Sequence, residues 1–308
     1  MYTDSQNFAI VQTELDDVFY QTFNEFTAFP GQATVDTSEV FKTISVTNAA
    51  YIEEVFSGVG LFSPTNELQP VATANPSVAN KYTVYPVTYT NGITLSKQWF
   101  DDNMHGVWAK TVQDFARKAR VTMDTVGFGV FRGAFTTTLT ADGTALINSA
   151  HPLISGGTES NLVTGALSTT TLNDAIVKLG QMKDQSGIIL GNQAKFLLVP
   201  PALFNLAMRI TDSALYQGTG NNDINTYRSA FGIRVYTSPY LGASAGGSDT
   251  AWFLMSDNHS VTRYKRQGIA TSLRNWTESN NLSYYYQANF RETYAAIDYN
   301  GIVGSTGL

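Results

Sequence analysis

The chain contains no cysteine, which excludes disulfide bonds and thiolate metal sites. Charge is also scarce, because 14% of the residues are charged, against about 25% in an average soluble domain. The net charge of −6 leaves the chain as a whole without the positive surface that binding to nucleic acid needs. The N-terminus has no basic segment followed by an apolar run, and no apolar run is long enough to span a bilayer. We therefore expect a protein that is used without secretion.

Aromatic residues are plentiful, with 16 Tyr and 18 Phe among 308 residues. A charge-poor and aromatic-rich composition resembles the buried part of a protein–protein interface. A neutral, β-rich protein is the alternative that composition leaves open. The length is sufficient for a sizeable core and for two domains.

Sites for metals, cofactors and catalysis are not indicated by the sequence. The three histidines, His105, His151 and His259, are isolated, without the H-x-x-x-H or H-E-x-x-H spacing of zinc sites. Neither of the common glycine-rich phosphate-binding motifs occurs. Adjacent carboxylates such as Glu53-Glu54 point different ways and do not form an acid–base pair. We expect no catalytic, cofactor-binding or metal-binding residue, and no cofactor.

One segment matches the sequence motif of the serine hydrolases. Ser244 lies at the centre of a G-x-S-x-G sequence, and Asp249, Asp257 and His259 follow it in hydrolase order. That mechanism requires a strand, a strained turn and then a helix. The segment that follows, TAWFLM, predicts a strand instead. A flexible hairpin loop is the better interpretation, and a serine hydrolase using Ser244 remains a distant alternative.

The only basic cluster comprises Lys265 and Arg266, with Arg263 and Arg274 nearby. These side chains could face phosphate. A solvated strand face or an ion pair between subunits is the preferred interpretation.

A long amphipathic helix is predicted over residues 98–131. Its apolar residues recur at steps of three and four, and Asp101 and Asp102 lie in its first turn, where a carboxylate meets the positive end of the helix dipole. At about 1.5 Å per residue this helix would be roughly 50 Å long. The opposite face is predicted to carry Lys110, Asp114, Lys118 and Asp124, and the helix is predicted to fray and stop at Gly127, Gly129 and Gly133.

Before this helix, residues 1–42 combine a helical pattern with an aperiodic, Phe-rich part, which we interpret as an arm that packs on another surface. Residues 43–56 predict a strand and a short turn. Residues 57–96 predict a long two-stranded excursion with a tight turn at Asn91-Gly92. Such a hairpin is only marginally stable alone, so it needs a partner surface within the chain or from a neighbouring copy.

After the helix, short strands and loops are followed by an α/β region. A helix is predicted over residues 172–183, with Thr171 as its cap, Asp174 completing a capping box and Gly187 after its end. Further predictions are a strand over 196–199, a helix from Pro201, strands at 232–240 and 250–256, and a strand-rich remainder with a break at Asn280-Asn281.

Several stretches resemble a known family. They are LINSAHPLISGGTESNLVTGALS at 146–168, LNDAIVKLGQMKDQSGIILG at 172–191, KFLLVPPALFNLAMRI at 195–210, and YNGIVGSTG near the end. With the order of parts, these stretches are similar to the major capsid protein of tailed double-stranded-DNA bacteriophages, closest to the Mu-like major head subunit group. The resemblance covers most of 97–308, and 1–96 only in general character.

The resemblance implies an α+β fold with four parts. These are an N-terminal arm (1–42), an extended loop (57–96), a peripheral domain holding the long helix (43–56, 97–145 and 262–290), and an axial domain (146–261 and 291–308).

The implied function is structural and not enzymatic. Hexamers and pentamers of the chain would form the icosahedral head, which encloses double-stranded DNA without sequence-specific binding, after assembly in the host cytoplasm. Because Met1 is followed directly by the arm, a separate scaffolding protein is expected, with a portal and a possible decoration protein. Some relatives cross-link subunits, but no motif around Lys81 matches that chemistry.

Two alternatives to a phage head remain open from the sequence. One is the shell of an encapsulin-type nanocompartment, which has the same fold, and the other is a monomeric binding module. In either shell, weak contacts are multiplied over many copies. We therefore expect the apolar residues of arm and loop to become buried only on assembly.

Overall fold

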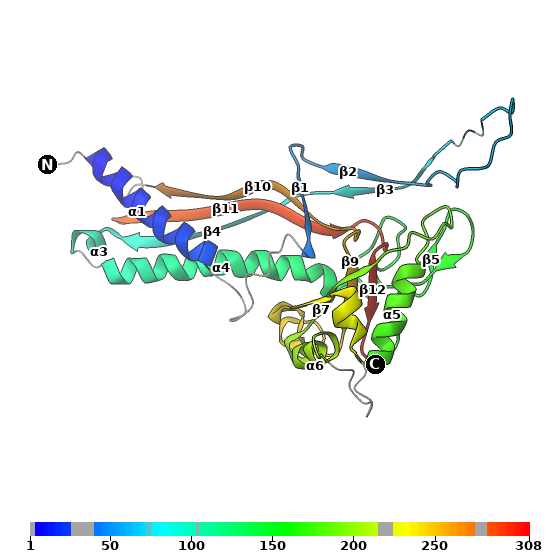
Figure 1. The fold of residues 1–308 in the computed structure, drawn as a ribbon. Coiled ribbons are helices and arrows are strands. Elements are labelled where there is room, and N and C mark those ends of the chain that lie inside the picture. The colour runs from blue at the N-terminus through cyan, green and yellow to red at the C-terminus, as the bar shows by residue number, and fades with distance from the viewer. Residues whose placement is uncertain are drawn as a thin grey trace.

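The computed structural model describes residues 4–25, 40–71, 73, 75–102, 105–214, 224–274 and 282–308. The molecule is elongated (Figure 1). One half consists of long strands and a long helix that run side by side, and the other is a smaller α/β layer near the C-terminus. A thin hairpin projects from the junction of the two halves, away from both.

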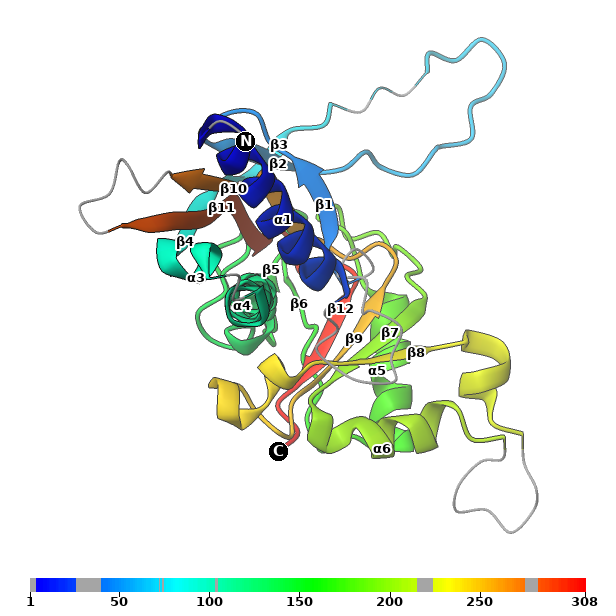
Figure 2. The same cartoon turned by 90° about the vertical axis from the view of Figure 1, so that its left-hand side faces the viewer.

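The long sheet has the strand order β1 (Lys42–Ser45), β10 (Val261–Arg274), β11 (Ser283–Ala296) and β4 (Val87–Ser96). The β1–β10 pair is parallel and the other pairs are antiparallel. Two helices, α1 (Asp4–Glu25) and α4 (His105–Arg132), pack on one face, as the end-on view shows (Figure 2). The core between them contains Phe19, Phe115 and Tyr286.

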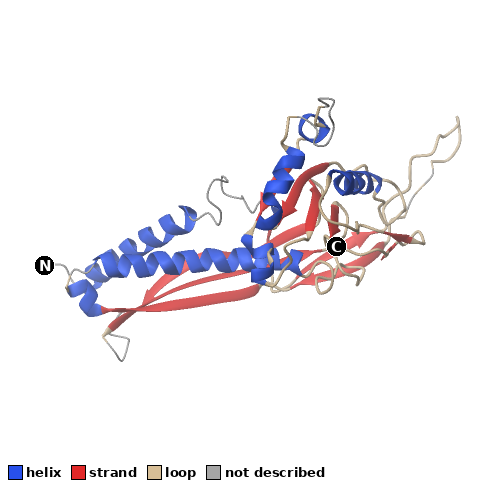
Figure 3. Ribbon diagram, turned by 90° about the horizontal axis from the view of Figure 1, so that it is seen from below, coloured by secondary structure: helices blue, strands red, loops and turns tan. Residues whose placement is uncertain are grey.

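The second sheet has the order β12 (Ile302–Ser305), β9 (Trp252–Ser256), β7 (Ala194–Val199) and β8 (Arg234–Thr237). Strands β9 and β12 are buried along their whole length. Helices α5 (Thr169–Gln181) and α6 (Pro201–Thr211) bury their apolar faces against this sheet. Seen from below, the helices and strands of the two halves meet near the C-terminal end of α4 (Figure 3).

The remaining elements are short. They are the projecting hairpin β2 (Tyr51–Phe56) and β3 (Val78–Val84), helix α3 (Lys97–Asp101), strands β5 (His151–Pro152) and β6 (Thr158–Glu159), a π-helix η1 (Tyr227–Phe231), and the 3₁₀ turns η2 (Pro239–Leu241) and η3 (Ala243–Ala245). None of the described helices is long and apolar enough to cross a membrane.

The predicted α+β fold is confirmed, and so is the apolar stripe of the long helix, of which Trp108, Val112 and Phe115 are buried. The strand at 196–199 and the helix beginning at Pro201 are also confirmed. The break predicted at Asn280-Asn281 lies outside the described residues.

The start of the long helix was predicted wrongly. Residues 97–101 form the separate helix α3, and α4 begins at His105, so Asp101 and Asp102 are not in its first turn. Helix α4 has 28 residues and is about 42 Å long.

Its end was also mispredicted. Helix α4 runs through Gly127 and Gly129 to Arg132, and the turns that stop it begin at Gly133. Gly127 is kept inside the helix by packing, because a Cβ there would lie 3.1 Å from the ring of Tyr294 on β11. Asp124, predicted on the exposed face, is buried instead, whereas Lys110 is exposed as predicted.

The predicted excursion at 57–96 has different partners from those expected. Strand β3 pairs with β2, and β4 belongs to the long sheet. Asn91-Gly92 is not a turn but lies within β4, opposite Ala288 and Gln287. Gly92 allows the side chain of Tyr285 to pack closely on β4, because a Cβ at this position would clash with that ring.

The cap of α5 was placed one turn too late. The N-cap is Ser168, whose hydroxyl accepts the amide of Thr171 at 3.1 Å, and Thr171 returns a hydrogen bond to the amide of Ser168 at 2.9 Å. Thr171 is therefore the inner half of the capping box, and Asp174 has no part in it. The helix ends at Gln181, before Gly187.

Candidate functional site

The loop between β2 and β3 is the most exposed apolar segment of the described chain. Leu61, Phe62, Leu68 and Val71 expose between 78% and 103% of their area, and Val59 exposes 55%. Glu67 is the only charged residue between positions 57 and 77. Isolated exposed apolar residues are ordinary, but a cluster on one projecting loop marks an interaction surface.

The loop closes at a narrow neck. The amide of Ser57 donates to the carbonyl of Ser77 at 2.9 Å, and the hydroxyl of Ser186 donates to the carbonyl of Ser57. Below the neck, Lys81 on β3 pairs with Glu54 on β2 at 2.8 Å. These contacts fix both ends of the loop on the body of the molecule while its apolar residues stay outside.

A hydrogen-bonded side-chain pair and an apolar cluster that includes Tyr51 and Val84 anchor the base of the hairpin to the long sheet. The hydroxyl of Tyr264, fully buried on β10, donates to the carboxylate of Glu53 on β2 at 2.8 Å. Burial raises the pKa of Tyr264, and the bond to Glu53 raises it further. The phenol therefore remains a donor over the whole physiological range. Sequence analysis missed this anchor, because the two residues are far apart in the chain.

The arm helix α1 is already buried in part by its own chain. Leu15 and Phe19 are fully buried against α4 and the sheet, and the Phe19 ring lies 5.7 Å from that of Phe115. The carboxylate of Asp16 accepts hydrogen bonds from the hydroxyls of Thr271 and Tyr286, each at 2.7 Å. The expectation that the arm's apolar residues are buried only on assembly is therefore wrong for this helix.

A buried charged cluster joins α4 to the sheet. Nε of Arg263 donates to Glu292 at 2.8 Å, and the hydroxyl of Tyr294 donates to the same carboxylate at 3.0 Å. Asp124 on α4 lies 3.5 Å from Arg120. Burial raises the pKa of Asp124, although Arg120 and Arg263 act in the opposite direction. Of the basic cluster seen in the sequence, Arg263 is thus neither solvated nor between subunits but paired within the chain.

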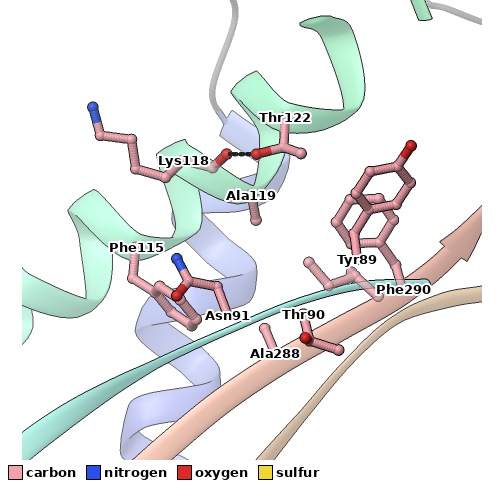
Figure 4. A pocket seen from close by; sticks show the side chains of 10 residues that line it. Tyr89, Thr90, Asn91, Phe115, Lys118, Ala119, Thr122, Ala288 and Phe290 are labelled. Atoms are coloured by element: carbon pink, nitrogen blue, oxygen red, sulfur yellow. Dashed lines mark hydrogen bonds between the residues drawn. The ribbon is translucent and has the colours of Figure 1, made fainter. Parts of the chain in front are cut away.

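A small apolar hollow of about 180 Å³ lies between α4 and strands β4, β10 and β11 (Figure 4). Phe115, Ala119 and Phe290 are among its lining residues, and the amine of Lys118 points away from it. Its lining carries no acid, base or nucleophile placed for catalysis.

The residues of the hydrolase motif do not form a triad. Ser244 lies in the 3₁₀ turn η3, and the next regular element is strand β9, as the sequence predicts. A nucleophile elbow requires a helix after the serine instead. The carboxylate of Asp249 accepts the amide of Ala243 at 2.9 Å. Among the described residues, no group of three or more His, Asp or Glu is arranged to hold a metal ion.

Comparison with known proteins decides what this arrangement is. The family model described as phage capsid protein matches residues 81–304. The chain belongs to this family. It is a structural capsid protein and not an enzyme, and the family favours a phage head over a nanocompartment shell. No curated protein sequence matches the chain.

Solved structures with a similar fold include three particles. The virus-like particle from Pyrococcus furiosus has a TM-score of 0.55 at 7% identity, covering 95% of this chain and 98% of that one. Microbacterium phage Oxtober96 has a TM-score of 0.54 at 13% identity, covering 92% of this chain and 94% of that one. The capsid of bacteriophage JBD30 decorated with minor capsid protein trimers has a TM-score of 0.53 at 13% identity, covering 71% of this chain and 93% of that one.

The capsid protein therefore forms the shell of a virion by self-assembly. The sequence predicted the excursion that contains the exposed loop, but it gave no signal for the neck, the Tyr264–Glu53 anchor or the buried ion pair.

Proposed function

We propose that the loop at 57–77 lies on a neighbouring copy within hexamers and pentamers of the capsid shell. The observation that carries this proposal is the exposure of Leu61, Phe62, Leu68 and Val71 on a loop whose ends are fixed at the neck. Covering apolar surface is favourable by about 25 cal/mol per Å². Each copy both gives and receives one such contact, and the gain is multiplied around the closed shell.

We further propose the division of the chain into an arm (1–42), an extended loop (57–96), a peripheral domain (43–56, 97–145 and 262–290) and an axial domain (146–261 and 291–308). Support comes from the two sheets, each of which packs on a hydrophobic cluster. A third cluster joins α4 to the second sheet, and β4 at the end of the extended loop belongs to the long sheet. In this proposal the second sheet and its helices surround the axis of a hexamer or pentamer.

The finer assignment is to the Mu-like major head subunit group, on the sequence stretches quoted above. In this proposal the shell assembles in the host cytoplasm with a separate scaffolding protein and a portal, and encloses double-stranded DNA. A decoration protein is supported by the likeness to the fold of the decorated JBD30 capsid.

The test compares particle formation by three forms of the chain, each produced under the same conditions. They are the wild type, a variant with Leu61, Phe62, Leu68 and Val71 changed to Ser, and a control with the exposed Ser63 and Thr65 changed to Ala. Negative-stain microscopy and sedimentation should show particles for the wild type and control, and folded but unassembled subunits for the apolar-to-Ser variant. Particles of normal size and yield from that variant would refute the proposal.

A further inference from the structure

A buried polar cluster lies where the segment between α4 and α5 meets the connection from β11 to β12. Its members are Asp142, His151, Asn161 and Tyr299, and the ring of His151 is fully shielded from solvent. The Tyr299 ring stacks on that of His151, with centroids 4.2 Å apart. No part of the proposed assembly surface uses these residues.

The first ring nitrogen of His151 must carry a proton. Its Nδ1 lies 2.7 Å from Oδ2 of Asp142, and an ionised carboxylate can only accept. The hydroxyl of Thr144 donates its proton to Oδ1 of Asp142 at 2.9 Å. The same hydroxyl lies 2.8 Å from Nδ1 of His151, so it can only accept a hydrogen bond from the ring.

The second ring nitrogen must carry a proton as well. Nε2 of His151 lies 3.2 Å from Oδ1 of Asn161. The orientation of that amide is fixed, because its Nδ2 donates to the carbonyls of Leu146 at 2.7 Å and Ile302 at 3.2 Å. Its Oδ1 also accepts the amide of Asn148 at 2.8 Å. An amide oxygen offers the ring only lone pairs, so Nε2 donates.

We infer that His151 is held as an imidazolium and forms, with Asp142, a buried charged latch between the two halves of the molecule. Asp142 is suited to this pairing. Burial raises its pKa, but hydrogen bonds from His151, Thr140 and Thr144 outweigh burial and hold the pKa well below its usual range. A buried ion pair is tolerated when its remaining hydrogen-bonding positions are filled, as they are on both partners here.

The latch adds to backbone contacts between these segments, among them the amide of Gly304 on β12, which donates to the carbonyl of Asn161 at 3.1 Å. Ala141, next to Asp142, donates its amide to the carbonyl of Ile297 at 2.8 Å, just after β11. Asn161 reaches the carbonyl of Ile302 at the start of β12. The hydroxyl of Tyr299 donates to the carbonyl of Lys183 at 3.2 Å, beyond α5. The latch therefore helps to set the angle between the long sheet and the second sheet.

Several carboxylates lie near the latch. Glu159 is the strand partner of His151 across β5 and β6, and Asp298 and Asp184 act electrostatically on the stacked Tyr299. Asp298 is itself buried, and burial raises its pKa. A neutral ring at His151 would leave one of its nitrogens facing an acceptor oxygen, so only the cation satisfies every contact of the latch.

Nitrogen NMR of assembled particles labelled at histidine tests the charge directly. The His151 signals are assigned by their absence from His151→Gln particles. At pH 7.5 both ring nitrogens should carry a proton. An unprotonated ring nitrogen at that pH overturns the inference.

Thermal unfolding of the particles tests the latch. His151→Gln, which leaves the Asp142 carboxylate buried without its cationic partner, should lower the Tm of the particles, and adding Asp142→Asn should restore part of that loss. Asp249→Asn, which alters an exposed carboxylate that also accepts a backbone amide, should unfold at the Tm of the wild type. A double variant less stable than His151→Gln contradicts the latch, and NMR of the wild type decides the charge even if a variant does not assemble.

Discussion

Gly127 and Gly129 lie two residues apart in α4, and packing requires only one of them. A Cβ at Gly127 would meet Tyr294 at 3.1 Å and Phe41 at 3.4 Å, whereas at Gly129 it would meet only the guanidinium of Arg132, at the ordinary contact distance of 3.4 Å. In a helix interior, alanine is favoured over glycine by about 1 kcal/mol.

We therefore expect Gly129→Ala to raise the free energy of unfolding by about 0.5–1 kcal/mol. Gly127→Ala should lose that gain, because the rings of Tyr294 and Phe41 must move. Calorimetry of the two variants measures the difference, and an equal gain from both would mean that α4 does not need its close approach to β11.

The burial of Asp124 predicts that the stability of the folded chain falls as the pH rises. Because burial raises its pKa in the folded chain above that in the unfolded chain, ionisation of Asp124 costs stability as the pH rises through the folded pKa. Asp124→Asn should therefore be more stable than the wild type at pH 7 and unfold at a higher temperature.

This advantage should disappear below about pH 3, where the aspartate is protonated in both states, because the pKa of an unfolded Asp is about 3.9. Thermal unfolding at the two pH values checks it. A variant that is less stable at pH 7 would show that the interaction of Asp124 with Arg120 outweighs the cost of burial.

At the scale of elements, helix α1 and the loop at 57–77 behave differently although both are rich in apolar residues. Phe19 on α1 is fully buried, and Phe62 in the loop is fully exposed. Phe19→Ala should cost the isolated subunit about 3–5 kcal/mol of stability, since it leaves a cavity beside Phe115.

Phe62→Ala should leave the stability of the isolated subunit within about 0.5 kcal/mol of the wild type, because an exposed side chain makes few contacts. Denaturant unfolding of unassembled subunits gives both values. A large loss from Phe62→Ala would mean that the loop packs on its own chain.

The sequence correctly predicted those elements whose signal comes from residues close together in the chain. The apolar stripe of α4, the strand at 196–199 and the proline that opens α6 all depend on neighbours in the chain. Sequence-based prediction failed where the local structure depends on contacts with distant segments of the chain. Asn91-Gly92 has the composition of a tight turn, but pairing with β11 makes it part of a strand.

The same limit applies to the candidate site. Low charge and exposed apolar residues in the loop could be read from composition, whereas the partner of Tyr264 could not, because Glu53 is 211 residues away. Asp124 has the helical spacing of a solvated residue, and it is buried only because β10 and β11 bring Arg263 and Glu292 under the helix.

At the scale of the whole molecule, the low charge predicts how the shell responds to salt. The exposed loop has one charged residue between positions 57 and 77, so contacts made through it do not depend on ion pairs. Raising the salt concentration from 0.1 M to 1 M shortens the screening length from about 10 Å to about 3 Å.

The assembled fraction should therefore stay constant or rise over this range, because salt also weakens repulsion between subunits of net charge −6. Sedimentation at each salt concentration measures it. Dissociation into subunits at 1 M would show that ion pairs elsewhere on the surface hold the shell together.

The neck at Ser57 and Ser77 has a consequence for how such shells diversify. Because the two ends of the loop are held together by the body, residues can be added or removed between them without disturbing either sheet. Doubling a flexible loop costs only about 0.6 kcal/mol in closure entropy. The reach of the subunit can therefore lengthen or shorten while its two sheets stay the same.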